Sequence, residues 1–281
     1  MKVVLFCGGY GLRMRTHTES APKPMMTIGD RPVLWHIMRY YAHFGHTEFI
    51  LCLGYGAQSV KEYFLRYDET QSNDFVMSKG GQGIELLQSD ISEWTISFID
   101  TGIETPIGER LRRVRHLLGD DEVFLANYGD VLTDAPMNDI VSDFMKTDNV
   151  ASLLAVSPQE SFHVVGIDGD DQVNGIVPVG DLDMRINGGY FVLRQGIFDV
   201  LDKNEDLVMD GFPRLAAERK LQAVRYDGFW APMDTLKERN ALEQMHRSGK
   251  APWKLWAPAE AEEPTDLEVP VVPVQVMEPA L

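Results

Sequence analysis

The N-terminal stretch MKVVLFCGGYGLRMR, residues 1–15, decides the fold. Val3–Cys7 is an unbroken apolar run that ends at glycines, a pattern typical of a strand buried in a parallel sheet. Three glycines within four residues follow it: Gly8, Gly9 and Gly11. Because no Cβ atom blocks them, backbone N–H groups in such a loop approach a phosphate chain closely. The stretch therefore predicts a first strand that opens into an anion-binding loop, and a simple tight turn is the alternative.

The residues that follow bring positive charge to the same loop. Arg13, Arg15 and Lys23 lie close together in an otherwise acidic chain. The spacing G-G-x-G-x-R differs from the dinucleotide-binding pattern G-x-G-x-x-G, and it is not the P-loop pattern G-x-x-x-x-G-K-[ST]. Neither of these two nucleotide-binding motifs is therefore predicted here, and a solvated basic face is the alternative to a phosphate site.

Farther along the chain, short apolar runs alternate with stretches whose apolar residues recur every three or four positions. The expected strands span 3–7, 48–53, 95–99, 123–127 and 151–156, and the expected helices span 32–44, 58–67, 109–118, 137–146 and 234–248. This alternation predicts an α/β fold with a doubly wound, mostly parallel, Rossmann-like sheet. From about 161 to 194 the strands follow one another closely, which predicts a small antiparallel excursion. In such sheets ligands bind beyond the carboxyl ends of the strands.

Composition limits the classes of function. The chain has 281 residues, with 26 Lys and Arg against 43 Asp and Glu, which gives a formal net charge of −17. So acidic a chain is not expected to bind nucleic acid or an anionic membrane surface. Two cysteines are too few for a disulfide scaffold or a cysteine-based metal cluster, and they suit a reducing compartment. We expect a soluble, cytoplasmic protein.

Two aspartates are candidates for holding a divalent cation. Asp130 ends the segment Tyr128-Gly129-Asp130, directly after the expected strand 123–127, and Asp234 precedes the last expected helix. Carboxylates at such positions hold Mg²⁺ against substrate phosphates, and usually one or two carboxylates bind each ion. The structural alternatives are a turn residue for Asp130 and a helix N-cap for Asp234. A metal site therefore requires that the two side chains meet in space.

A set of longer motifs points to a known family. They occur across residues 1–256 in the order GGYGLRMR, APKPMMTIGDRPVLWHIM, LGYGAQSVKEYF, DTGIETPIGERLRRV, YGD, INGGYFVL, GFWAPMDT and GKAPWKLW. In this order the chain resembles the sugar-1-phosphate nucleotidyltransferases, and most closely their glucose-1-phosphate cytidylyltransferase branch. The run RPVLWHIM together with GFWAPMDT and GKAPW carries that closer resemblance, because the glycine loop alone is not specific.

The resemblance implies a reaction and its partners. Such enzymes transfer a nucleotidyl group from a nucleoside triphosphate, here expected to be CTP, to a sugar 1-phosphate, here expected to be glucose 1-phosphate. Pyrophosphate leaves, Mg²⁺ is the cofactor, and the enzymes commonly form homo-oligomers. The implied organisation is a nucleotidyltransferase domain over residues 1–257, with a nucleotide half at about 1–135 and a sugar-binding half at about 136–257. Residues 258–281 then form an acidic, Pro-rich tail, either solvated or extended along a neighbour.

The resemblance also assigns roles to individual residues. The implied nucleotide-binding residues are Gly8, Gly9, Gly11, Leu12, Arg13, Thr101, Gly108 and Arg110. Arg13 and Lys23 are the implied catalytic cations on the phosphates, and Asp130 and Asp234 the implied Mg²⁺ ligands. On the sugar side the implied residues are Asn187 and Gly188. Trp230, close to Asp234 in the sequence, is a candidate for shaping the sugar pocket, with a place in the core as the alternative.

Two departures from the family pattern bear on the chemistry. Leu12 stands where the family loop has Thr, so a hydroxyl donor to phosphate is lost. Ile176 and Val177 stand where the family has a Glu-Lys pair that holds the sugar and its phosphate. A phosphate that faces valine loses a charge-assisted contact, and we predict that Arg185 replaces it.

These departures leave alternatives open. One is the same reaction with a different nucleoside triphosphate and a cyclic phosphate other than glucose 1-phosphate. Another is a non-catalytic homologue that binds a nucleotide or a nucleotide sugar and acts as a regulatory subunit. Arg13, Lys23, Asp130 and Asp234 are all present, which favours catalysis, because a binding relic has little use for both metal carboxylates.

Overall fold

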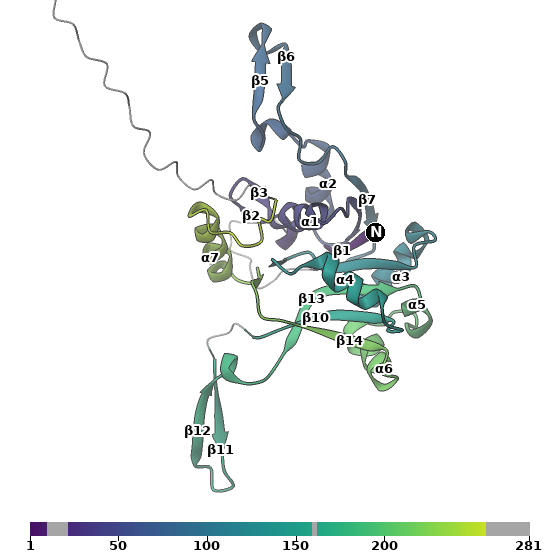
Figure 1. The fold of residues 1–281 in the computed structure, drawn as a ribbon, viewed down its shortest axis with the longest axis vertical. Helices are drawn as coiled ribbons and strands as arrows, with labels where there is room; N and C mark the ends of the chain where they lie inside the picture. The colour runs from purple at the N-terminus through teal and green to yellow at the C-terminus, as the bar shows by residue number, and fades with distance from the viewer. Residues whose placement is uncertain (10–21, 159–161, 257–281) are drawn as a thin grey trace, which may run out of the picture.

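A seven-stranded sheet forms the centre of the molecule (Figure 1), whose computed structural model describes residues 1–9, 22–158 and 162–256. The strands lie in the order β14 (Leu221–Tyr226), β10 (Ala151–Val156), β13 (Ile186–Arg194), β8 (Val123–Tyr128), β1 (Lys2–Phe6), β4 (Glu48–Leu53) and β7 (Thr95–Asp100). The N-terminal strand therefore lies inside the sheet, with β8 on one side and β4 on the other.

Most neighbours in this sheet run parallel. β1 is parallel to β4 and β8, β4 to β7, and β10 to β14, whereas β13 is antiparallel to both of its neighbours. The predicted α/β fold with a mostly parallel sheet is confirmed. Because β13 pairs with β8, one sheet runs through both of the halves predicted at about 1–135 and 136–257. The tail 258–281 lies outside the described residues.

Seven α-helices are found in the described ranges. They are α1 (Val33–His43), α2 (Ala57–Leu65), α3 (Ile107–Leu118), α4 (Met137–Met145), α5 (Ile197–Val200), α6 (Phe212–Ala217) and α7 (Leu236–Arg247). The five helices predicted from apolar spacing match α1, α2, α3, α4 and α7 with shifts of a few residues at their ends. In the part of the chain that is described, no helix has the length and apolar character needed to cross a membrane.

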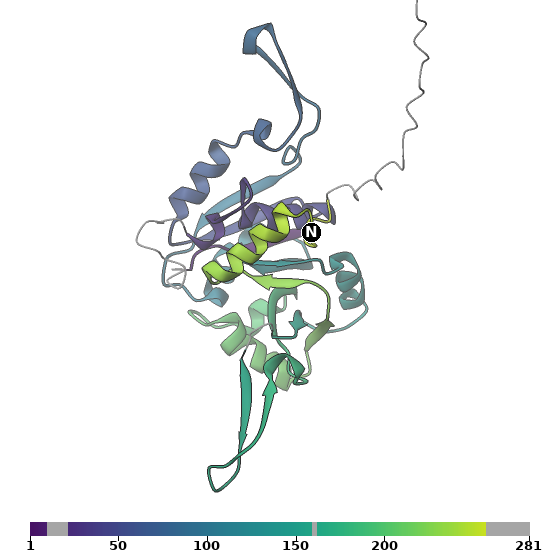
Figure 2. The same cartoon turned by 90° about the vertical axis from the view of Figure 1, so that its left-hand side faces the viewer.

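The inner strands of the sheet bury both of their faces, which gives the molecule two cores. Val3 and Leu5 of β1 pack in the core that contains α1 and α4, whereas Val4 and Phe6 pack in the core of α3, α5 and α6. The alternation follows from the strand pleat, which turns successive side chains to opposite faces. Figure 2 shows the sheet between these helical layers. The apolar run at the N-terminus is thus the signature of a strand covered on two sides.

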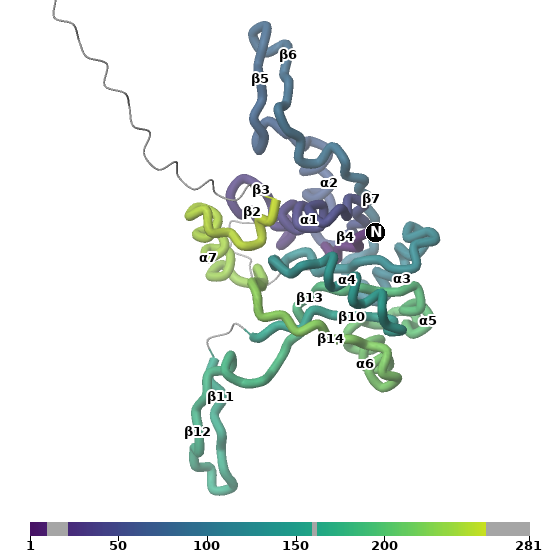
Figure 3. The backbone as a smooth tube through the Cα atoms, viewed as in Figure 1, coloured from purple at the N-terminus to yellow at the C-terminus, as the bar shows by residue number. Residues whose placement is uncertain are grey.

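Two antiparallel hairpins project from the body toward opposite ends of the molecule, as the tube of Figure 3 shows. One is β5 (Phe75–Ser78) with β6 (Gly83–Leu86), and the other is β11 (His163–Ile167) with β12 (Val173–Pro178). The second hairpin and the antiparallel strand β13 account for the excursion predicted at about 161–194, which is confirmed. The first hairpin was not predicted.

Two short ladders join distant parts of the chain beside the main sheet. They are β2 (Thr27–Ile28) with β3 (Arg31–Pro32), and β9 (Val131–Thr133) with β15 (Trp230–Pro232). Helix α7 is attached to the first ladder, because Arg239 Nε donates to the Thr27 carbonyl at 3.2 Å and the Gly29 amide donates to Glu243 at 2.7 Å. The C-terminal helix is thereby fixed to the segment that follows Lys23.

Candidate active site

A cleft of about 1170 Å³ opens beyond the carboxyl ends of β1 and β8. Phe6 and Cys7 line it at the end of β1, and Tyr128 lines it at the end of β8. The other walls come from the residues around Lys23, from the loop 103–107 and from the segment 229–245. The cleft therefore lies where ligands bind in open α/β sheets.

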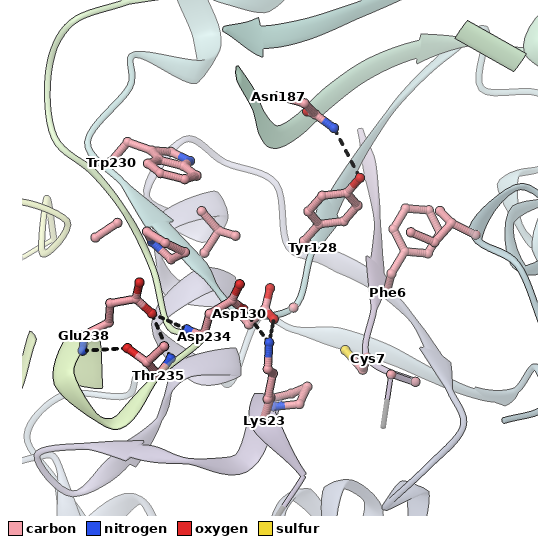
Figure 4. Close-up of a pocket in the computed structure, with 18 of the residues that line it drawn as sticks. Phe6, Cys7, Lys23, Tyr128, Asp130, Asn187, Trp230, Asp234, Thr235 and Glu238 are labelled. Atoms are coloured by element: carbon pink, nitrogen blue, oxygen red, sulfur yellow. Dashed lines mark hydrogen bonds and ion pairs between the residues drawn. The ribbon is translucent and has the colours of Figure 1, made fainter. Parts of the chain in front are cut away.

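Lys23 and the two predicted metal carboxylates meet in this cleft. Lys23 Nζ lies 3.3 Å from Asp130 Oδ2 and also forms a short ion pair with Asp234 Oδ1. Figure 4 shows the ammonium group between the two carboxylates. Two acids that are more than a hundred positions apart in the sequence thus share one cation, which fulfils the spatial condition set by the sequence.

The ladder between β9 and β15 is the reason that the two aspartates meet. Asp130 directly precedes β9, and Asp234 follows β15, whose Pro232 pairs with Val131. The strands are antiparallel, so the beginning of one lies beside the end of the other. The Met233 amide donates to the Asp130 carbonyl at 2.8 Å, which closes the ladder at this point. Lys23 reaches the same place from a one-turn helix, Lys23–Met25, that has a proline on either side of the lysine.

Burial and charge act against each other in this cluster. Burial lowers the pKa of Lys23, but the carboxylates of Asp130 and Asp234 outweigh it, and the net pKa is raised. Burial raises the pKa of Asp130, Lys23 opposes that change, and the neighbouring charge of Asp234 adds to it. The ammonium is therefore held in its charged form, whereas Asp130 is a carboxylate whose charge depends on a cation beside it.

The donor set fits a divalent cation that is also bound by phosphates. No group of three or more His, Cys, Asp or Glu side chains converges in the described ranges, so no all-protein metal cage exists there. Mg²⁺ is commonly bound by only one or two carboxylates together with substrate phosphates, and Asp130 and Asp234 supply two. Because the Lys23 ammonium already lies between them, the position suits positive charge.

The N-cap of helix α7 is Thr235 and not Asp234. Thr235 Oγ1 accepts from the Glu238 amide at 3.2 Å, and the Glu238 carboxylate accepts from the amides of Thr235 and Asp234 at 2.8 and 2.7 Å. This reciprocal arrangement is a capping box, and it satisfies the first N–H groups of the helix. The N-cap role considered for Asp234 is therefore wrong, because its side chain is turned to Lys23 instead.

The sugar side of the prediction lies at a bulge in β13. Leu153 pairs with Phe191 and Ala155 with Asn187, so β13 has extra residues at Gly188 and Gly189. Gly189 has φ +76, and a Cβ atom there would lie 2.5 Å from the Tyr128 ring. Such a bulge redirects the adjoining side chain, and Asn187 lines the cleft, where it donates to Tyr128 Oη at 3.2 Å.

Trp230 is both a core residue and part of the cleft lining. Its ring is 6% exposed, and its indole N–H donates to the Gly188 carbonyl at 2.8 Å. A Cβ atom on Gly188 would lie 3.2 Å from that same indole nitrogen. Gly188 therefore has a structural role beside Trp230, and the indole presents a fixed apolar surface to the cleft.

Arg110 lines the cleft, but its donors are used inside the protein. Its guanidinium donates to the carbonyls of Thr105, Leu53, Gly8 and Ile103 and to Thr101 Oγ1, at 2.8 to 3.2 Å. These contacts engage all five of its N–H groups. A Cβ atom on Gly8 would lie 1.9 Å from Arg110 Nη1, so this glycine is needed for the arginine.

Of the other residues assigned to the nucleotide, Gly9 alone among those described lines the cleft, and the rest lie away from it or outside the described ranges. Thr101 is fully buried beneath Arg110, and Gly108 packs against the backbone of 205–207, so neither is part of the lining. Gly9 does line the cleft and has open space around it. Gly11, Leu12 and Arg13 fall in 10–21, outside the described residues.

The predicted replacement for the missing phosphate contact is not in the cleft. Arg185 forms an ion pair with Asp227 and donates to the Tyr226 carbonyl at 3.3 Å, and it is absent from the lining. Its guanidinium lies on Asp227 in this structure, so its role as the sugar-phosphate cation stays a prediction. Ile176 and Val177 lie on the projecting strand β12, 63% and 40% exposed.

The family of the chain follows from its sequence and this site together. A family model described as nucleotidyl transferase matches residues 2–237. The chain belongs to the nucleotidyl transferase family. The enzyme class predicted from the motifs is thus confirmed, and the cleft with Lys23, Asp130 and Asp234 lies within the matched residues.

Two bacterial relatives of this nucleotidyl transferase match it over nearly its whole length. A glucose-1-phosphate cytidylyltransferase of Salmonella typhi is 37% identical over 260 residues, which cover 91% of this chain and 100% of the relative. A probable glucose-1-phosphate cytidylyltransferase of Bacillus subtilis is 34% identical over 258 residues, with the same coverage. These identities over nearly the full length confirm the resemblance seen in the motifs.

Solved structures share the fold of this nucleotidyl transferase. HddC from Yersinia pseudotuberculosis superposes with a TM-score of 0.61 at 18% identity, over 87% of this chain and 99% of that chain. A putative glucose-1-phosphate thymidylyltransferase from Bacillus anthracis superposes with a TM-score of 0.60 at 17% identity, over 86% and 95%. At such identities the likeness concerns the fold alone.

Sequence reasoning on this nucleotidyl transferase missed several cleft residues. Tyr128 was noted only as part of a motif, and Asp206 and Lys237 were not considered at all, although each lines the cleft. No local pattern marks Asp206, because the segment that carries it reaches the cleft only through tertiary packing. The capping box was readable, since Thr235 precedes Glu238 by three residues.

Proposed function

We propose that this protein transfers a cytidylyl group from CTP to glucose 1-phosphate, giving CDP-glucose and pyrophosphate, with Mg²⁺ as the cofactor. The single observation that supports this chemistry best is the convergence of Lys23, Asp130 and Asp234 in one cleft of a nucleotidyl transferase. The choice of CTP and glucose 1-phosphate rests on the relatives that are 34 to 37% identical over nearly the whole chain.

The reaction needs no covalent intermediate with the protein. An oxygen of the sugar phosphate attacks the α-phosphorus of the triphosphate and forms a new P–O bond. The bond from that phosphorus to the bridging oxygen of the β-phosphate breaks, and pyrophosphate leaves with the electron pair. The attacking phosphate is already anionic, so a dedicated general base is unnecessary, and catalysis consists of positioning and charge neutralisation.

Each residue of the cluster has a distinct part in this proposal. Asp130 and Asp234 would hold Mg²⁺, which neutralises phosphate charge when it is bound. Lys23 is kept protonated by the same carboxylates, which accept two of its three N–H groups, so the third is available to a phosphate oxygen. Tyr128 and Asn187 form the polar edge of the sugar side, and Trp230 offers it an apolar surface.

A pyrophosphate-release assay over four nucleoside triphosphates and a panel of sugar 1-phosphates tests the proposal. We expect release with CTP and glucose 1-phosphate, and a loss of about a thousandfold in Asp130→Asn and Asp234→Asn, because each loses a charged metal contact. Asp139→Asn, an exposed aspartate on α4, is the matched control and should keep full activity. Nucleotide binding without release from any pair would favour the regulatory alternative.

The acceptor is the part of the proposal with a specific competitor. Val177 stands on the projecting strand β12 and brings no charge to the cleft, unlike the lysine that the family pattern has there. The phosphate of a cyclic compound other than glucose is therefore the second candidate acceptor. The panel of sugar 1-phosphates separates it from glucose 1-phosphate by the ratio of kcat/KM values.

A further inference from the structure

The carboxylates that line the cleft differ in what their oxygens contact. Five of them lie in the described lining: Glu104, Asp130, Asp206, Asp234 and Glu238. Asp130 and Asp234 hold Lys23, and Glu238 caps α7. Glu104 is exposed on a loop, whereas Asp206 is partly buried and fixed in place. Asp206 is thus a rigid cleft carboxylate that neither the cation cluster nor the cap of α7 uses.

Hydrogen bonds hold Asp206 by one oxygen only. Its Oδ1 accepts from the amides of Val208 and Met209 at 2.8 and 2.9 Å, at the start of the π-helical segment Leu207–Gly211. Its own amide donates to Asp210 at 2.8 Å. None of the described residues donates to Oδ2. A carboxylate has about four acceptor positions, so Asp206 keeps free acceptor capacity on a fixed side chain.

The surroundings of Asp206 suit an uncharged polar ligand. Ile107, Phe162 and Ile186 line the same cleft as Asp206, so the lining also contains apolar side chains. Asn187 donates to Tyr128 Oη at 3.2 Å, so the phenol oxygen accepts this bond and its own hydrogen is available for another. The Tyr128 hydroxyl is therefore a donor in the same cleft as the Asp206 acceptor.

A negative charge at this wall also restricts which end of a substrate lies there. Asp206 repels phosphate groups, whereas the hydroxyl groups of a sugar ring donate readily to a carboxylate. An acceptor with one phosphate and several hydroxyls is thereby oriented, with its phosphate toward Lys23 and its ring toward Asp206 and Tyr128. The ring's C–H surfaces would pack on the apolar residues of the same wall.

We propose that Asp206 is a specificity-determining residue whose carboxylate accepts hydrogen bonds from the ring hydroxyls of the sugar phosphate. The inference rests on the proposed function and names the residue that selects a polyhydroxylated acceptor. Asp206 also supplies a carboxylate to a site in which Ile176 replaces the glutamate of the family pattern. A merely structural Asp206 would need only the Oδ1 contacts with Val208 and Met209.

The side-chain amide of asparagine separates these two roles. Asp206→Asn keeps an oxygen for the cap, because Asn and Asp cap helices about equally well, but it loses the charge and the second acceptor. Asp206→Ser keeps a capping oxygen without adding an amide donor, and it serves if the asparagine variant folds poorly. Asp202→Asn is the matched control, since Asp202 is exposed four residues earlier and is not part of the cleft lining.

The experiment measures KM for glucose 1-phosphate and for CTP in these variants, together with the melting temperature. In Asp206→Asn we expect KM for glucose 1-phosphate to rise about tenfold to a hundredfold, the range typical of a lost hydrogen bond to a charged group. KM for CTP and the melting temperature should stay at the wild-type values. At least one deoxy analogue of glucose 1-phosphate should have a higher KM than glucose 1-phosphate itself with the wild type. Its KM with the variant should be no higher than with the wild type.

Several results would overturn the inference. They are an unchanged KM for glucose 1-phosphate in Asp206→Asn, an equal rise in KM for CTP, and deoxy analogues that penalise wild type and variant alike. If the wild type released no pyrophosphate from any pair, the proposed function would fail separately. Calorimetric titration with glucose 1-phosphate then decides about Asp206, because equal affinity of wild type and variant, or no binding to either, contradicts the proposed contact.

Discussion

Lys23 and Arg110 are basic residues of the same cleft, but they are held in opposite ways. Lys23 is bound by the carboxylates of Asp130 and Asp234, and their charges raise its pKa. Arg110 is bound by four backbone carbonyls and one hydroxyl, and burial lowers its pKa. One residue therefore has charged partners, and the other has neutral backbone partners.

This difference gives the two side chains different expected roles in the proposed reaction. A metal ion in the cleft would compete with Lys23 for the two carboxylates, and a phosphate would compete with the carboxylates for Lys23, because all of these groups are charged. The carbonyls around Arg110 belong to several loop and strand ends, which move only if the protein rearranges. Position in a cleft therefore does not establish a catalytic role, whereas the chemistry of the partners does indicate one.

Lys23→Met should have the largest effect on activity. The substitution removes the ammonium and keeps most of the aliphatic stem, so kcat/KM should fall about a hundredfold to a thousandfold, as for other lost transition-state donors. The melting temperature should fall slightly in EDTA, because two carboxylates then face each other, and it should return toward the wild-type value when Mg²⁺ is added. Steady-state kinetics and thermal unfolding with and without Mg²⁺ measure both effects.

The exposed Lys203 provides the control for this variant. Lys203→Met removes the same charge outside the cleft and should change neither property. Near-wild-type turnover in Lys23→Met would show that the cluster of Lys23, Asp130 and Asp234 is only a structural ion pair. The contrast with Arg110 would then disappear.

The regular parts of this fold were predictable because their periodicity is strong. The strand Glu48–Leu53 was predicted with the bounds that the structure gives it, since an unbroken apolar run covered on two sides has few alternatives. The hairpin Phe75–Leu86 was missed because both of its faces are exposed, so apolar and polar residues do not alternate in a readable way. Apolar spacing thus indicates burial and not strand formation itself.

The site was predictable in its residue types and only partly in its geometry. Asp130 was found because it follows the end of a buried strand, but the ladder that joins it to Asp234 has strands of three residues, too short for any period. Arg110 was assigned to the nucleotide from its place in a family motif. Such a place does not say what the guanidinium contacts after folding. Asp206 reaches the cleft through tertiary packing, so no local signal identified it.

Arg110→Met tests the structural side of the comparison. It leaves several buried carbonyls without a donor, each of which costs about 1–3 kcal/mol where water does not replace it, so the free energy of unfolding should fall by about 3 kcal/mol. For a chain of this size the melting temperature should then fall by roughly 6–12 °C. Arg110→Lys should not restore stability, because one ammonium cannot reach five acceptors. A stable Arg110→Met protein without activity would instead support the direct nucleotide contact inferred from the sequence.

His36 extends the comparison to a basic group that is held neutral. Its Nδ1 accepts from the indole of Trp253 at 3.4 Å, so Nε2 carries the proton and faces the Ile28 carbonyl at 3.0 Å. Burial lowers its pKa to about 3, so the folded state does not take up the proton that an unfolded histidine binds below about pH 6.5. The free energy of unfolding therefore decreases as the pH falls below the pKa of His36 in the unfolded state and toward its pKa in the folded state. At about pH 5 this decrease amounts to about 2 kcal/mol.

His36→Gln should flatten this dependence on pH. Glutamine offers a donor and an acceptor in place of the two ring nitrogens but does not titrate, so the variant should be less stable than wild type at about pH 7.5 and should lose less on acidification. Urea unfolding at the two pH values measures the convergence of the two proteins. His46, whose pKa burial lowers to about 4, is present in both and contributes the same slope to each. Parallel losses in wild type and variant would mean that His36 takes up its proton without unfolding, so that burial does not hold this imidazole neutral.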